Sequence, residues 1–125
     1  MESPTPTPAP SPDLYLGLGS LLYALAKIDG QVQIDEMQTV REILAKEPFG
    51  DLTLFGFMLR EDYGETPDEA YKFAIRRFTN NRQCFDDALR KHFLELLMRV
   101  AEAHDDVSTK ERDLIQQFRR DLRKI

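Results

Sequence analysis

One acidic segment occurs twice in this chain of 125 residues. Residues 26–36 read "AKIDGQVQIDE" and residues 101–111 read "AEAHDDVSTKE", a constant offset of 75 positions (101 − 26). The copies agree at both ends and at Val32 and Val107, where a valine is placed to pin the loop onto the core. Each copy joins two segments with helical apolar spacing through a tight polar loop. Such a duplication predicts two helical hairpins packed into a pseudo-symmetric bundle, with residues 14–46 superposing on residues 87–122.

The first helical segment is apolar almost all round, which is typical of a centrally buried helix. Asp13 is predicted to be its N-cap. Gly17 and Gly19 lower helix propensity, so we expect them to allow a neighbouring helix to approach closely. Gly30 is expected to end the hairpin's first helix, because glycine adopts the left-handed conformation at little cost.

Five further helices are expected over residues 34–46, 51–62, 66–81, 86–103 and 108–122. Pro48 and Gly50 are predicted to break the second helix. The third segment, "LTLFGFMLRED", has the composition of a strand as well, and a helix is favoured because the rest of the chain is helical. Thr66 with Glu69, and Ser108 with Glu111, have the spacing of capping boxes. The fold class predicted is therefore all-α: a single-domain bundle of about six helices with an internal helix–loop–helix duplication.

The first twelve residues hold five of the seven prolines, at positions 4, 6, 8, 10 and 12. Prolines alternating with small or polar residues favour an extended polyproline II conformation and bury little apolar area. The even spacing and the lack of a flanking arginine argue against an SH3 ligand. Residues 1–12 are expected to be a flexible arm, residues 13–125 the helical domain, and removal of the arm is expected to leave stability unchanged.

Charge and composition exclude several classes of partner. The chain has 22 acidic and 17 basic residues, a net charge of −5, and no basic block, so neither nucleic acid nor an anionic membrane surface is expected to bind. The longest apolar run, residues 14–26, is shorter than the roughly 20 residues that span a bilayer, and no basic region of a signal peptide precedes it. Cys84 is the one cysteine, which excludes an intramolecular disulfide. These features favour the cytoplasm.

The acidic loops contain the candidate site. The segment from Asp29 to Glu36 is eight residues long, which is too short for the twelve-residue EF-hand loop. Two explanations stay open: the glutamates serve their helices locally, Glu111 by capping with Ser108 and Glu36 through the helix dipole, or the loops form oxygen-rich patches that suit a hard cation. The candidate metal ligands are Asp29, Asp35, Glu36, His104, Asp105, Asp106 and Glu111.

Two histidines and the cysteine allow other roles. His104 is placed to help hold a transition ion beside the aspartates, or to interact as an exposed residue with the helix dipole. His92 is expected at the surface beside Lys91, and Cys84 as a small apolar residue. The sequence has no Ser/His/Asp or Cys/His set and no glycine-rich phosphate loop, which argues against an enzyme.

The segments "ALAKIDGQVQIDE" and "RVAEAHDDVSTKE" resemble the two signatures of TerB-like proteins. The resemblance covers most of residues 14–125 and implies an all-helical, internally duplicated fold. It also implies an association with tellurite resistance and stress responses, and metal binding through acidic residues. Asp29 and Glu36 match the first acidic motif and Glu111 the second, whereas His104 and Asp105 stand where the family usually has aspartate and glycine.

A similar domain forms the amino-terminal part of some DjlA-like co-chaperones, but no J-domain His-Pro-Asp tripeptide occurs in this chain. The function expected is a non-enzymatic TerB-like module that takes a divalent cation of unspecified identity through its acidic loops. The alternative is a protein-binding adaptor, or a co-chaperone-related module, without metal; the acidic loops of the adaptor would contact a basic partner. A protein partner is expected in either case.

Overall fold

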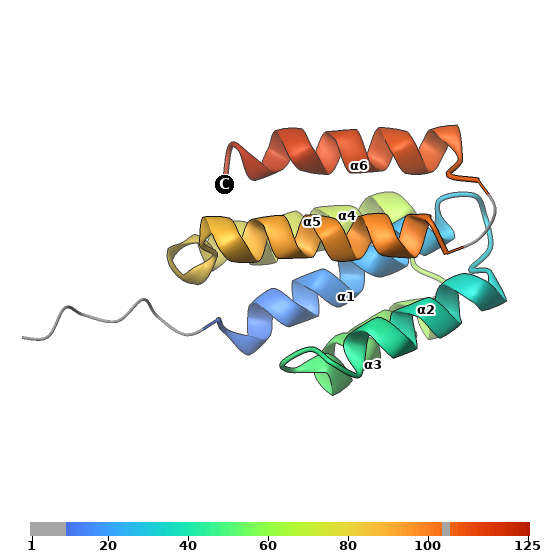
Figure 1. Ribbon diagram of the computed structural model, residues 1–125, viewed down its shortest axis with the longest axis horizontal. Coiled ribbons are helices and arrows are strands. Elements are labelled where there is room, and N and C mark those ends of the chain that lie inside the picture. The colour runs from blue at the N-terminus through green and yellow to red at the C-terminus, as the bar shows by residue number, and fades with distance from the viewer. Residues whose placement is uncertain (1–9, 104–105) are drawn as a thin grey trace, which may run out of the picture.

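The computed structural model describes residues 10–103 and 106–125, and those residues form α-helices without any β-strand. Figure 1 shows α6 along the outer side of α5, α4 behind α5, α1 near the centre, and α2 and α3 on the side opposite α6. The helices are α1 (Pro12–Lys27), α2 (Ile34–Leu44), α3 (Gly50–Tyr63), α4 (Pro67–Asn80), α5 (Asp87–Ala101) and α6 (Thr109–Leu122), with a 3₁₀ turn at Arg82–Cys84. The predicted all-α bundle of six helices is confirmed.

Helix α1 is the central element, packed most extensively against α3 and α4. A Cβ on Gly19 would lie 2.3 Å from the backbone oxygen of Thr53 in α3, so only glycine permits this crossing distance. A Cβ on Gly17 would lie 2.8 Å from the ring of Phe78 in α4. The predicted close approach at both glycines is confirmed, and it fixes the position of α3 against the core.

Helix α1 begins earlier than the sequence suggested. Its N-cap is Ser11, whose Oγ accepts a hydrogen bond from the Leu14 N–H, and Pro12 is its first residue. The prediction that Asp13 is the N-cap is wrong, because Asp13 contacts the end of α4 instead. One carboxylate oxygen of Asp13 lies 3.4 Å from Arg77 and the other accepts from the Asn81 side chain at 2.7 Å.

Residues 51–62 form a helix, as expected, within the longer α3. The buried face of α3, which includes Thr53, Gly56 and Phe57, turns toward α1. Helix α2 ends at Leu44, two residues before the expected end, and α5 ends at Ala101 rather than at residue 103. Pro48 and Gly50, which were expected to break α2, lie beyond its end, and Gly50 is the first residue of α3.

An aromatic cluster joins the second half of the bundle. The ring centroids of Phe78, Phe85, Phe93 and Phe118 lie 5.0–5.9 Å from their neighbours, linking α4, α5 and α6. Such tilted pairs contribute about 0.5–1.5 kcal/mol each beyond the burial of their area. This cluster and the leucines of α1 form one continuous core.

Burial raises the pKa of three tyrosines in the core. Burial raises the pKa of Tyr71 most, and the hydrogen bond that its hydroxyl donates to Asp121 of α6 raises it further. Burial likewise raises the pKa of Tyr15 and of Tyr23, with smaller effects from nearby carboxylates. The neutral phenol is therefore the form that the folded chain stabilises at these positions.

Candidate functional site

The α1–α2 loop ends in a capping box. The Glu36 carboxylate accepts a hydrogen bond from the Gln33 N–H at 3.2 Å, and Gln33 is the N-cap of α2. The Glu36 side chain is buried. Gly30, expected to end the first helix, takes a positive φ of 103° in the loop, after α1 has ended at Lys27. Besides a place in the candidate metal site, the sequence interpretation gave Glu36 a local role with the helix dipole and did not predict a capping box there. The signal it missed is that Gln33 lies three residues before Glu36, at the position equivalent to Ser108.

The α5–α6 loop ends in the same way. Glu111 Oε1 accepts from the Ser108 N–H at 2.9 Å, and Ser108 Oγ accepts from the Glu111 N–H at 3.1 Å. This confirms the predicted capping box. Glu111 is as buried as Glu36, and its second oxygen, Oε2, has no hydrogen-bond partner among the described residues. A buried carboxylate oxygen without a partner is costly, so this atom is the most unusual feature of the loop.

The remaining candidate metal ligands do not share the burial of Glu36 and Glu111 where the structure describes them. Asp29, Asp35 and Asp106 are exposed, while His104 and Asp105 lie outside the described residues. Within residues 10–103 and 106–125, no group of three or more His, Cys, Asp or Glu side chains is close enough to hold a metal ion. The structure therefore brings Glu36 and Glu111 into capping geometry, and the seven-residue metal site stays a prediction.

The two loops lie at the same end of the bundle, at the right of Figure 1, where α1 leads into α2 and α6 begins. Val32 and Val107, the matched valines, are partly buried and pack against the core. Their predicted pinning role is thus confirmed. Each valine also lines a groove beside its loop, of about 250 Å³ between α2 and α3 and about 400 Å³ beside α5 and α6.

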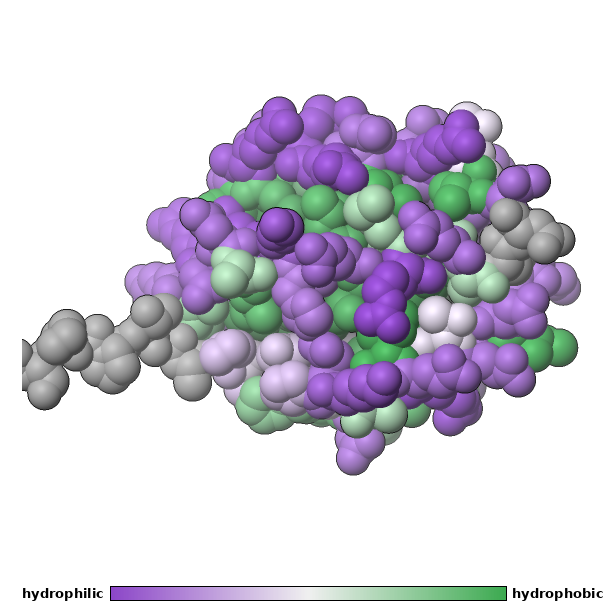
Figure 2. Space-filling model, in the orientation of Figure 1, coloured by the Kyte–Doolittle hydropathy of each residue, from purple (hydrophilic) through white to green (hydrophobic). Residues whose placement is uncertain are grey.

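The two grooves have different walls. Met37, Met58 and Ile34 line the groove between α2 and α3, with Arg41 and Glu61. The groove beside α5 and α6 carries Arg112, Arg119, Glu102 and Asp106 around an apolar floor that includes Met98 and Ile115. Figure 2 shows apolar surface along the seam between α5 and the hydrophilic outer face of α6.

All large apolar side chains that are exposed among the described residues lie between residues 34 and 63. They are Ile34 (77% exposed), Phe49 (44%), Phe55 (60%), Leu59 (40%) and Tyr63 (78%). The sequence interpretation missed this surface, because the third segment is dense in apolar residues on every side and its composition does not show which side is exposed. With the helical frame known, Phe55 and Leu59 fall on the side of α3 opposite Thr53 and Phe57.

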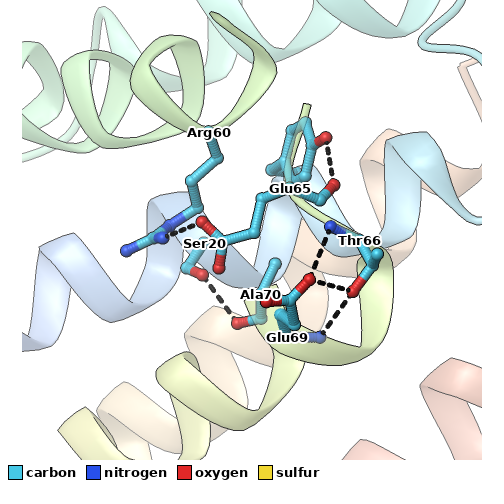
Figure 3. A network of polar contacts seen from close by, with 7 residues as sticks. Ser20, Arg60, Glu65, Thr66, Glu69 and Ala70 are labelled. Atoms are coloured by element: carbon cyan, nitrogen blue, oxygen red, sulfur yellow. Dashed lines mark hydrogen bonds and ion pairs between the residues drawn. The ribbon is translucent and has the colours of Figure 1, made fainter. Parts of the chain in front are cut away.

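Polar contacts at the corner between α3 and α4 hold α3 against the bundle (Figure 3). They include an ion pair of Arg60, the one arginine of α3. Arg60 lies 2.6 Å from Glu65, and its guanidinium stacks 3.9 Å from the Phe73 ring centroid. Ser20 donates to the Ala70 carbonyl at 2.6 Å, and Thr66 with Glu69 forms the predicted capping box. Arg60 is therefore unavailable to balance the carboxylates on the outer side of α3.

Cys84 and His92 have separate local partners. Cys84 is half-buried and its Sγ donates to the Asn81 carbonyl at 3.3 Å. His92 Nε2 lies 2.6 Å from Glu47 Oε1, in a partly exposed pair between α5 and the α2–α3 connection. Among the described residues no hydrogen bond joins Cys84 to His92, so these two side chains do not form a nucleophile–base pair there.

No helix among the described residues is both long and apolar enough to cross a bilayer.

In the comparison with known proteins, the model of the family described as tellurite resistance protein TerB matches residues 16–123. No curated protein and no solved structure gives a significant match. The matched region includes both acidic loops and nearly all of α1 through α6, so the chain belongs to the TerB family.

Proposed function

We propose that this chain is a non-catalytic TerB-like module that acts by binding another protein, within the tellurite-resistance and stress theme of its family. The observation that carries the proposal is the gathering of exposed large apolar side chains on residues 34–63. Contiguous exposed apolar surface on a small domain marks an interaction site more often than scattered residues do. The single cysteine is consistent with a reducing compartment, and the proposal places the chain in the cytoplasm.

Affinity capture from native lysate tests this function. The bait is the full chain, compared with the Phe55→Ser, Leu59→Ser double variant. The matched control is Lys91→Ser with Glu95→Ser, an exposed pair on α5 with the same four-residue spacing and no change in net charge. Specific proteins retained by the wild type and the control but lost from the Phe55 and Leu59 variant support the proposal. Identical captures by all three baits contradict it.

Divalent-cation binding is the second candidate function, and the partnerless Glu111 Oε2 is the observation that favours it. A cation near this oxygen would offset its desolvation, and oxygen ligands suit Ca²⁺ or Mg²⁺. The local capping bonds weigh against it, because they already account for one oxygen of each glutamate.

Calorimetric titration with Ca²⁺, Mg²⁺ and Zn²⁺ tests the cation directly. The variants are Glu111→Gln, Asp29→Asn with Glu36→Gln, and His104→Ala. Binding that Glu111→Gln abolishes supports a site at the second loop, and loss only in the double variant assigns the first loop. The absence of heat and of a thermal shift at millimolar ion leaves protein binding as the one function proposed.

A further inference from the structure

Helix α3 presents an apolar stripe, defined here as Phe55, Leu59 and Tyr63. These residues are four apart and exposed, so they follow one side of the helix. The opposite side is held by Thr53 and Phe57, which are fully buried against α1. The stripe is thus fixed on a rigid, well-packed helix rather than on a loop.

The stripe continues into the groove between α2 and α3. Met58 lines this groove and lies between Phe55 and Leu59 along α3, while Ile34 and Met37 supply the wall on α2. Methionine side chains adapt to irregular apolar partners at little cost. The stripe is about two helical turns long, because Phe55 and Tyr63 are eight positions apart and an α-helix has about 3.6 residues per turn. The groove adjoins it on the side of α3 that faces α2.

Carboxylates border this surface. Asp51 and Asp62 are exposed at the two ends of α3, and neither forms an ion pair among the described residues. Glu61 lines the groove, and its Oε2 is buried without a hydrogen-bond partner in that part of the chain. The one arginine of α3, Arg60, is already paired with Glu65. The border on α3 is therefore acidic, and Arg41 of α2 is the one basic residue that lines the groove beside it.

We propose that the stripe and the adjoining groove dock an amphipathic helix of a partner protein, whose apolar face is flanked by lysine or arginine. This inference rests on the proposed function and adds the chemistry of the partner. An apolar helix face buries against the stripe, and basic flanks meet Asp51, Glu61 and Asp62. The small area indicates a weak, reversible complex.

The charges on α3 favour a basic partner helix over a second copy of this chain as the occupant of the stripe. In an antiparallel pair of α3 helices, Asp51 of each copy faces the end that carries Asp62. In a parallel pair each aspartate faces its own equivalent. Both arrangements place like charges together at the edge of an apolar contact, which opposes association.

The test uses two designed peptides of about 15 residues, each forming an amphipathic helix with leucines and a tryptophan on one face. One carries lysines beside that face and the other glutamates. The chain has no tryptophan, so peptide fluorescence reports binding without background. We expect the lysine peptide to bind the full chain with a dissociation constant on the order of 10–100 μM, and the glutamate peptide to bind at least about tenfold more weakly.

Three variants locate the contact. Phe55→Ser with Leu59→Ser should weaken the lysine peptide at least about tenfold, whereas Lys91→Ser with Glu95→Ser should leave it unchanged. Asp51→Asn with Asp62→Asn alters charge alone, so it should reduce the difference in dissociation constant between the lysine peptide and the glutamate peptide. Equal binding of both peptides, or binding that ignores Phe55 and Leu59, overturns the inference.

Two other outcomes are decisive as well. A wild-type dimer in sedimentation that Phe55→Ser dissociates would assign the stripe to a second copy and overturn the inference. Lysate captures that depend on Phe55 and Leu59, combined with no preference for the lysine peptide, would leave the proposed function standing and reject the basic partner.

Discussion

The α1–α2 and α5–α6 loops share a cap but lead into helices with different surroundings. In both loops a buried glutamate accepts the N–H of the residue three positions earlier. Beyond the cap, Met37 of α2 corresponds by the offset of 75 to Arg112 of α6, an apolar groove wall replaced by a charged one. The two loops thus share the capping bond, whereas the surfaces beside them differ in charge and apolarity.

The neighbouring helix differs as well. Helix α2 borders its groove with α3, whereas α6 borders its groove with α5, the helix that precedes it in the same hairpin. The outer face of α6 carries exposed basic residues, and its apolar residues Leu114, Phe118 and Leu122 are buried. The proposed interaction surface is thus on the α2–α3 side, where the exposed large apolar side chains lie.

The largest expected effect separates two phenylalanines. Phe118→Ala on α6 removes a fully buried ring from the aromatic cluster and should lower the free energy of unfolding by about 3–5 kcal/mol. Phe55→Ala on α3 removes an exposed ring and should change it by less than about 0.5 kcal/mol. Urea denaturation of both variants measures the difference. A large loss at Phe55 would mean that its ring serves the fold.

A smaller effect tests whether the caps are equivalent. Glu36→Ala and Glu111→Ala each remove a charged acceptor from a backbone N–H and should each cost about 1–3 kcal/mol. The neighbouring exposed residues Asp35 and Lys110 also correspond by the offset, and their alanine variants serve as controls with changes near zero. A loss at one glutamate and none at the other would show that the copies have separated in role.

The sequence was sufficient for the helices, the capping box at Ser108 and the close approach at Gly19, because each depends on local propensity or on a residue type with one steric use. It did not locate the stripe. Which side of α3 faces α1 depends on how the helices cross, and the composition around Phe55 suits either side. The N-cap of α1 was misplaced because Asp13 and Ser11 both suit a cap, and the choice depends on contacts with α4.

The next smaller effect on stability tests the hydrogen bond that joins α4 to α6. Tyr71→Phe removes the hydrogen bond to Asp121 and should cost about 0.5–1.5 kcal/mol near neutral pH. The folded-state pKa of Tyr71 is raised above its ordinary value of 10.0, so its contribution is complete below pH 10 and declines as the pH rises further. Stability above pH 10 should therefore fall less steeply in Tyr71→Phe than in the wild type.

Chemical denaturation at a series of pH values measures this slope. Tyr63→Phe on the exposed stripe is the matched control, and its curve should follow the wild type. Parallel curves for Tyr71→Phe and the wild type across the alkaline range would argue that the Tyr71 hydroxyl does not link α4 to α6.

The smallest effect, a change near zero, is expected for removal of residues 1–9, and the capping role of Ser11 separates it from removal of residues 1–12. Ser11 caps α1 and donates to Asn81 at 2.9 Å, so removing residues 1–12 deletes a cap and a contact with the end of α4. That truncation should cost about 1–2 kcal/mol. Removing residues 1–9 keeps Ser11 and should leave the thermal midpoint unchanged, because alternating prolines bury little apolar area. A lower midpoint for the shorter truncation would show that the arm contacts the domain, and tighter peptide binding in that variant would place the contact on the stripe.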